Sequence, residues 1–285
     1  MTHALRLELD TRAAPEDAGA AAASFLLAAS DLVGGLVAAA AARTGDRVVA
    51  AGTRGPGTVA FSLATAARGG SGARGSRGGV SPKRLAAAAA QLRDGVLATV
   101  EVEAGTAPGP VRRRLLALVE VDYRGAWLNP ESAHLLSVHL DLGLLDALGE
   151  TAAVADRLWS LAAEVGPGLG AVGGFLVETA EQASRTREED AAGYGHDYGL
   201  RLVDRQVRGA GWGTLLPPAA VDMLGGADRV AAEAPVAAAV PFPNGAAWLR
   251  LAGAFPPAEG ALDRLRAYLG PVLPRERRPR SVPDA

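Results

Sequence analysis

The residues best suited to chemistry in this 285-residue sequence are His139 and Asp141, which stand two positions apart in the segment LLSVHLDL. If that segment is a strand, both side chains lie on one face, so an imidazole and a carboxylate could converge on a metal ion or a substrate. His196, in a polar region further along, is a third candidate. No spacing enforces such a site, and a partly exposed histidine on a strand is the alternative interpretation. One functional hypothesis is therefore an enzyme that uses these residues as acid–base groups or metal ligands.

Several familiar chemistries lack the residues that they need. The chain contains no cysteine, which excludes thiolate catalysis, disulfides and cysteine metal ligands. Gly168-x-Gly170-x-x-Gly173 matches a dinucleotide-binding pattern, but it follows a predicted helix and leads into a predicted strand, the reverse of what a phosphate site requires. The single lysine, Lys83, lies outside any phosphate-binding loop pattern. We expect neither a metal ion nor an organic cofactor.

A second candidate site is an acidic stretch, residues 178–197. Its candidate partner-binding residues are Glu188, Glu189, Asp190, Tyr194 and Tyr198. Carboxylates steer a basic partner toward a surface and tyrosines anchor it there, so this stretch could bind a basic protein. A solvated loop is the alternative interpretation of the same composition. If the stretch is a binding surface, reversal of its three consecutive acids to arginine should slow association at low salt and leave the fold intact.

Residues 67–82 form a Gly- and Arg-rich loop without an acidic residue. Such a segment could bind an anion or a nucleic acid, but no aromatic residue is interleaved for base stacking. The formal net charge of the whole chain is −2, so no overall positive field attracts nucleic acid. We therefore expect a flexible, solvated linker and no nucleic-acid partner.

Residues 18–42 form an alanine-rich apolar run that is long enough to be checked as a membrane span. Asp31 lies inside the run, and alanine is a weak membrane residue. Pro15 suits the first turn of a helix, and Gly45 suits its end. We expect a long buried helix in a soluble, cytoplasmic protein without a secretory signal or membrane contact.

The elements that must position these residues alternate between strands and helices. The first half predicts strand, helix, two strands, helix and two strands, and the second half predicts a strand–helix–strand unit followed by strand, helix, hairpin and helix. We expect the hairpin to turn at Asn244-Gly245, because both residues tolerate positive φ. This order predicts an α+β fold of two ferredoxin-like β-α-β-β units with a mainly antiparallel sheet. The expected division is an N-terminal half at 1–130, a C-terminal half at 131–272 and a disordered tail at 273–285.

The segment 205–253 is the most strongly punctuated part of the chain. Its characteristic residues are Arg208, Gly209, Trp212, Leu215, Leu224, Gly225 and Gly226, followed by the final helix. This pattern resembles the C-terminal part of a bacterial family of uncharacterised proteins, some of which are labelled type VI secretion immunity proteins. The resemblance implies a non-catalytic, protein-binding protein, immunity-like or accessory, with a toxin-like partner. The enzyme that uses His139 and Asp141 remains the alternative.

Overall fold

The computed structural model of the chain describes residues 3–50, 58–67, 76–106, 115–123, 132–180, 186–194 and 200–275. The strands of these residues are β1 (His3–Thr11), β2 (Arg47–Ala50), β3 (Thr58–Ala67), β4 (Ser76–Gly79), β5 (Leu97–Thr106), β6 (Leu115–Asp122), β7 (His134–Asp141), β8 (Ala171–Ala180), β9 (Gly213–Leu216), β10 (Ala238–Pro241) and β11 (Ala247–Arg250). The helices are α1 (Pro15–Thr44), α2 (Pro82–Arg93), α3 (Leu142–Leu148), α4 (Thr151–Leu169), α5 (Arg187–Ala191), α7 (Pro218–Met223), α8 (Ala227–Glu233) and α9 (Glu259–Leu269).

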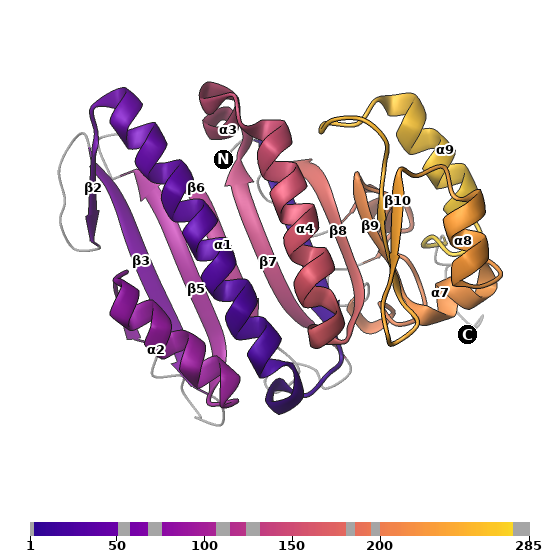
Figure 1. The fold of residues 1–285 in the computed structure, drawn as a ribbon, viewed down its shortest axis with the longest axis horizontal. Helices are drawn as coiled ribbons and strands as arrows, with labels where there is room; N and C mark the ends of the chain where they lie inside the picture. Colours follow the sequence, from indigo (N-terminus) through magenta and orange to yellow (C-terminus); the bar gives the residue numbers. More distant parts are fainter. Residues whose placement is uncertain are drawn as a thin grey trace, which may run out of the picture.

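All strands of the described residues belong to one sheet of eleven strands, in the order β10-β11-β9-β8-β1-β7-β6-β5-β3-β2, with β4 paired to β3 (Figure 1). The pairing of β2 with β3 is parallel, whereas the other pairings are antiparallel. The predicted α+β class and the mainly antiparallel sheet are thus confirmed. Two separate ferredoxin-like units are not seen, because the first strand, β1, pairs with β7 on one side and β8 on the other. Alternation within each strand predicts such strands but does not say which strand lies beside which.

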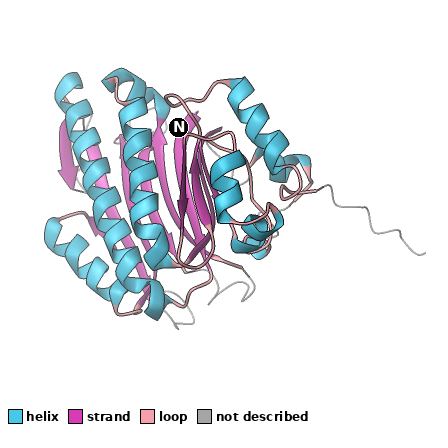
Figure 2. Cartoon of the chain, turned by 45° about the vertical axis from the view of Figure 1, so that its right-hand side comes forward, coloured by secondary structure: helices cyan, strands magenta, loops and turns pink. Residues whose placement is uncertain are grey.

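The helices α1, α2, α3 and α4 lie together on one face of the sheet, and α7, α8 and α9 lie near the end formed by β9, β10 and β11 (Figures 1 and 2). The sequence of β1 explains why one face needs this cover. Leu5, Leu7 and Leu9 alternate along the strand and are fully buried in the hydrophobic core. The intervening residues, Arg6, Glu8 and Asp10, face the other side of the sheet and are buried as well.

The long helix α1 confirms the predicted helix over residues 18–42. Pro15 opens it, Glu16 and Asp17 lie at its positive end, and Gly45 ends it in the left-handed conformation. By length and composition α1 could cross a membrane, and 44% of its most apolar window is buried. In this structure α1 packs against α2, α4 and several strands of the sheet.

The second half confirms the predicted hairpin, in which β10 and β11 pair antiparallel around Asn244-Gly245. Helix α4 runs through Gly166-Pro167-Gly168 and continues to Leu169. Pro167 has no backbone N–H to donate to the preceding turn, and the helix ends soon after it. Gly170 then ends the helix with φ of 58°.

Glycine is required where β9 passes under Trp248. A Cβ atom on Gly213 would lie 2.8 Å from the ring of that tryptophan. The Trp248 ring stacks on Trp159 of α4 with 6.5 Å between centroids, and its Nε1 donates a hydrogen bond to the Trp159 carbonyl at 3.1 Å. Gly213 and the two tryptophans therefore allow α4 to pack closely against β9 and β11.

Candidate functional site

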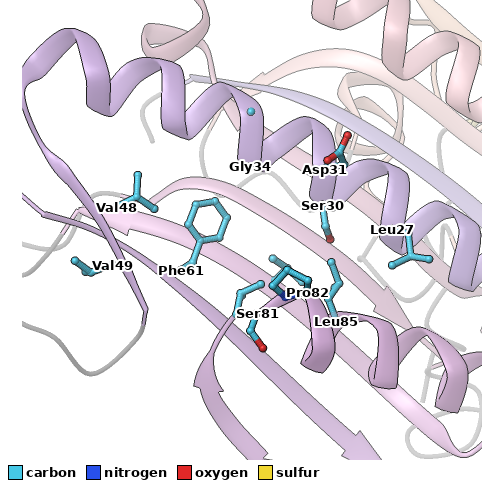
Figure 3. A pocket seen from close by; sticks show the side chains of 13 residues that line it. Leu27, Ser30, Asp31, Gly34, Val48, Val49, Phe61, Ser81, Pro82 and Leu85 are labelled. Atoms are coloured by element: carbon cyan, nitrogen blue, oxygen red, sulfur yellow. The ribbon is translucent and has the colours of Figure 1, made fainter.

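An apolar groove lies between α1 and α2 at the β2 end of the sheet, with a volume of about 630 Å³ (Figure 3). Phe61 of β3 and Val102 of β5 form its floor, and Val48 of β2 forms its outer wall. Leu27 of α1 and Val48 are 38% and 46% exposed, and they are two of the four large hydrophobic residues that are exposed among the described residues. The groove therefore concentrates apolar surface that the described residues leave uncovered.

The groove begins where the close packing of α1 against α2 ends, at the first turn of α2. A Cβ atom on Gly19 would lie 2.6 Å from the carbonyl oxygen of Leu92, so the beginning of α1 touches the end of α2. At the other end of α2, Ser81 caps the helix and Pro82 occupies its first turn. There α1 presents Gly34 and Gly35, and a Cβ atom on either would meet nothing within 4 Å. The absence of side chains at these two glycines leaves the groove open.

Two polar residues of α1 accompany the apolar walls. Figure 3 shows Leu27 and Ser30 pointing from α1 toward Pro82 and Leu85, with Asp31 at the rim. Ser30 is 7% exposed, and among the described residues its hydroxyl has no hydrogen-bond partner. Asp31 also borders a shallower groove between α1 and α4, and it makes no ion pair with any described residue. One unsatisfied hydroxyl and one exposed carboxylate thus border the apolar surface.

The structure gives His139 and Asp141 separate environments. Asp141 is buried, and its Oδ1 accepts a hydrogen bond from the backbone N–H of Leu144 at 2.8 Å, which caps α3. His139 lies opposite Arg6 of β1 and is half-buried. Burial first, and then the positive charge of Arg6, lowers the pKa of the His139 imidazole to about 3. His139 is therefore neutral near pH 7, and Asp141 has a structural role at the end of its strand.

A buried ionic cluster lies on the face of β1 opposite the helices. It consists of Arg6, Glu8, Asp10, Glu189 and Arg208, all of which are at most 3% exposed. Arg208 pairs with Glu8, reaches Asp10 at 3.2 Å and Glu189 at 2.8 Å, and contacts Glu189 with two of its nitrogens. Both guanidinium groups stand over the ring of Phe175, at 5.3 Å from Arg6 and 5.1 Å from Arg208.

Burial shifts the ionisation of this cluster. Burial first, and then the charge of Arg6, lowers the pKa of Arg208 to about 9, which still leaves the guanidinium charged at neutral pH. Burial raises the pKa of Glu189 to about 7, while hydrogen bonds from Thr186 act in the opposite direction. The short contact of Glu189 with Arg208 also favours the carboxylate. These shifts have structural causes, and the charges are satisfied by one another.

The four described residues of the predicted acidic surface differ in their exposure. Glu189 is 1% exposed and Tyr194 is buried, with its hydroxyl 3.1 Å from Gln206 Oε1. Glu188 is largely buried and accepts a hydrogen bond from Arg266 at 3.0 Å, whereas Asp190 is exposed. Tyr198 lies outside the described residues.

Three further sequence predictions fall wholly or partly outside the described residues. His196 lies outside them, as do residues 68–75 of the Gly- and Arg-rich loop and residues 276–285 of the predicted tail. Within the part of the chain that the structure describes, no group of three or more histidine, cysteine, aspartate or glutamate residues is placed to hold a metal ion.

The residues behind the family resemblance have structural roles. Arg208 is the centre of the ionic cluster, and a Cβ atom on Gly209 would lie 2.7 Å from Glu188 and Thr186. Trp212 is buried, and its Nε1 donates a hydrogen bond to the Gly253 carbonyl at 3.1 Å. The groove residues Leu27, Ser30 and Asp31 were missed by the sequence analysis. The glycine pair at 34–35 was the available signal, since glycine inside a helix weakens it and needs a reason.

The fold is thus that of an α+β protein with a single large sheet, covered by helices on one face. No protein-family model matches the sequence, and no curated protein matches it. Among solved structures, the chain is similar to the Pseudomonas aeruginosa T6SS protein PA0821, with a TM-score of 0.53 and 10% sequence identity. The match covers 98% of this chain and 77% of that protein, so the likeness extends over the whole fold.

Proposed function

We propose that this chain is a non-catalytic, protein-binding protein of a bacterial type VI secretion setting, immunity-like or accessory, with a toxin-like partner in the cytoplasm. The observation that carries the proposal is the apolar groove between α1 and α2, where Leu27 and Val48 remain exposed. Contiguous apolar surface that the described residues leave uncovered is one mark of an interaction site, and a protein–protein contact is one such site.

The fold likeness supports the secretion setting. The similar solved structure is titled a T6SS protein, and the match covers nearly the whole of this chain. The resemblance in the segment 205–253 points to the same setting, since it leads to a family partly labelled as type VI secretion immunity proteins. An immunity protein acts by occupying its toxin, so it needs a complementary surface and no reacting groups.

The placement of the candidate catalytic residues gives the enzyme alternative no support. Asp141 caps α3, and the pKa of His139 lies too low for a base that takes and returns a proton near pH 7. The lining of the groove contains an isolated carboxylate, Asp31, and no second titratable side chain beside it among the described residues.

The proposal is tested by co-expressing the chain with each protein that is encoded beside it in its own genome. We expect one of these proteins to slow growth when expressed alone and to be neutralised by co-expression. The purified pair should form a complex of defined stoichiometry, seen by size-exclusion chromatography with light scattering, with a Kd below about 1 µM. If no encoded neighbour is bound or neutralised, the proposal is wrong.

A further inference from the structure

We infer that the groove between α1 and α2 receives an amphipathic helix of the partner protein, with apolar side chains inside the groove and an arginine or lysine at its rim beside Asp31. This inference rests on the proposed protein-binding function and names the kind of segment that the site takes. The occupant follows from three properties of the groove: its place in the helix layer, its shape and its polar groups.

The first property is the place of the groove in the layer of helices. A sheet of this kind buries one face under packed helices, and α4 and α1 provide that cover over the centre. Near Gly19, α2 packs closely against α1, and beyond the first turn of α2 the groove lies over Phe61 between α1 and β2. In this part of the helix layer the described residues place no helix over Phe61. A helix from another protein would complete the layer.

The second property is the shape and size of the groove. Its wall on α1 follows one helical stripe, Leu27, Ser30, Asp31 and Gly34, spaced by three and four residues. A volume of about 630 Å³ also lies in the range of small-molecule sites, so the test must distinguish a helix from a small apolar ligand. A helix that presents apolar side chains at i, i+3 or i+4 and i+7 matches a groove that runs along a helix.

The third property is the chemistry of the two polar residues. The buried Ser30 hydroxyl has no partner among the described residues, and a buried polar group without a partner costs free energy that a bound donor or acceptor recovers. Asp31 is exposed at the rim and carries the only charge in the groove lining of the described chain. A cationic side chain that lies along apolar walls and reaches a carboxylate at the rim is a common use of arginine and lysine. The charge therefore favours a basic residue at the edge of the apolar face.

The test uses designed peptides as probes of the full chain. The first is a helix of about 15 residues with leucines at i, i+3, i+7 and i+10 and one arginine at the edge of that face. The second replaces the arginine by glutamate, and the third carries a central proline that breaks the helix. Binding is measured by fluorescence anisotropy, and Nile red serves as a probe for a small apolar ligand.

Two protein variants separate filling of the groove from its charge, each with a matched control. Gly34→Leu places a side chain in the open space, and Ala39→Leu adds the same side chain at an exposed position of α1 outside the groove. Asp31→Lys reverses the rim charge, and Asp94→Lys makes the same change at the exposed far end of α2. Thermal unfolding of all four verifies that each is folded.

We expect the arginine peptide to bind the native chain and the two controls alike. Gly34→Leu should weaken it by about tenfold or more, and Asp31→Lys by about fivefold, with preference shifted to the glutamate peptide. The inference is overturned if no peptide binds with a Kd below about 1 mM, or if the proline peptide binds as tightly as the arginine peptide. It is also overturned if Gly34→Leu changes the binding of Nile red alone and of no peptide. A neighbour-encoded partner that binds Gly34→Leu as tightly as the native chain also overturns it and leaves the proposed function standing. Peptide binding without any such partner would instead contradict the proposed function.

Discussion

The ionic cluster on β1 and the groove beside α1 both reverse the usual relation between polarity and burial. In the cluster, five charged side chains are almost completely removed from water. In the groove, leucine and valine side chains remain in contact with water. The two regions lie on opposite faces of the same sheet, since Arg6, Glu8 and Asp10 point away from the helices that border the groove.

The difference between the two regions lies in where their partners come from. Each carboxylate of the cluster has a guanidinium group of the same chain within ion-pair distance, and Phe175 completes the packing. Among the described residues, Leu27 and Val48 are 38% and 46% exposed. A buried charged side chain is tolerated when an opposite charge pairs with it. An exposed apolar patch is typical of a surface that a partner molecule covers. The ion pairs of the cluster are made within the fold, whereas the binding role that we propose for the groove requires a partner.

The largest effect is expected from reversal of a buried charge in the cluster. Glu189→Arg would place a third guanidinium beside Arg6 and Arg208 and remove the acceptor that closes the cap of α5, so we expect a loss of about 5 kcal/mol or more. Asp190→Arg is the matched control, because Asp190 is exposed and the change there should stay within about 0.5 kcal/mol. The earlier expectation that all three acids can be reversed with the fold intact does not agree with the burial of Glu189. The free energy of unfolding of the two variants is measured by urea denaturation. Equal stabilities would contradict the burial of Glu189 in the ionic cluster.

A smaller but still large loss is expected when the central cation is removed. Arg208→Ala leaves buried carboxylates on β1 and α5 without their main partner, which typically costs about 3–5 kcal/mol. The control is Arg187→Ala, since the Arg187 side chain is 72% exposed and its pair with Glu259 spans 3.6 Å. A loss below about 1 kcal/mol for Arg208→Ala, measured by chemical denaturation, would show that the cluster contributes little.

One part of the pH dependence of stability should come from the imidazole beside the cluster. The raised pKa of Glu189 contributes a part of opposite sign, so the two are separated by comparing the native chain with a His139 variant. The pKa of His139 is lowered from 6.5 to about 3, so the unfolded chain binds a proton more readily than the folded chain between these values. The stabilisation is complete above pH 6.5 and is lost progressively as the pH falls toward 3. Between pH 7.5 and 5 this amounts to about 2 kcal/mol. His139→Gln should remove that part of the pH dependence, and an unchanged slope in the variant would contradict the assignment.

The sequence predicted the local elements well because their signals are local. Proline and acids at the start of α1, Gly45 at its end and Asn244-Gly245 in the hairpin each determine the backbone around them. The order of strands could not be predicted in the same way. Pairing of β1 with β8 joins residues that are far apart in the sequence, and it requires the chain to come close at Gly174, where a Cβ atom would lie 2.4 Å from the Glu8 carbonyl oxygen.

The candidate site was harder to predict because side-chain type alone does not reveal burial. Glu188, Glu189 and Asp190 look equivalent in the sequence, yet one is buried, one is mostly buried and one is exposed. The alternation Arg6-x-Glu8-x-Asp10 is typical of the water-facing side of a strand. Here these side chains are buried, because Arg208, which is far away in the sequence, pairs with Glu8 and Asp10. The groove also depends on distant segments, since Leu27, Val48 and Phe61 come together only when α1 and β3 are in place.

The smallest expected effect on stability comes from the groove, and it has the opposite sign. Gly34→Ala adds a methyl group where nothing lies within 4 Å, and alanine favours a helix over glycine by about 0.8–1 kcal/mol. The fold should therefore become more stable by up to about 1 kcal/mol, in contrast to every variant of the ionic cluster described above. Gly45→Ala is the matched control, because Gly45 has φ of 72° and an alanine there is strained and should destabilise the end of α1. Thermal unfolding of the two variants measures both effects. A loss of stability in Gly34→Ala would mean that the groove is already filled when the chain is alone, and that its glycines are needed by the fold and not by a partner.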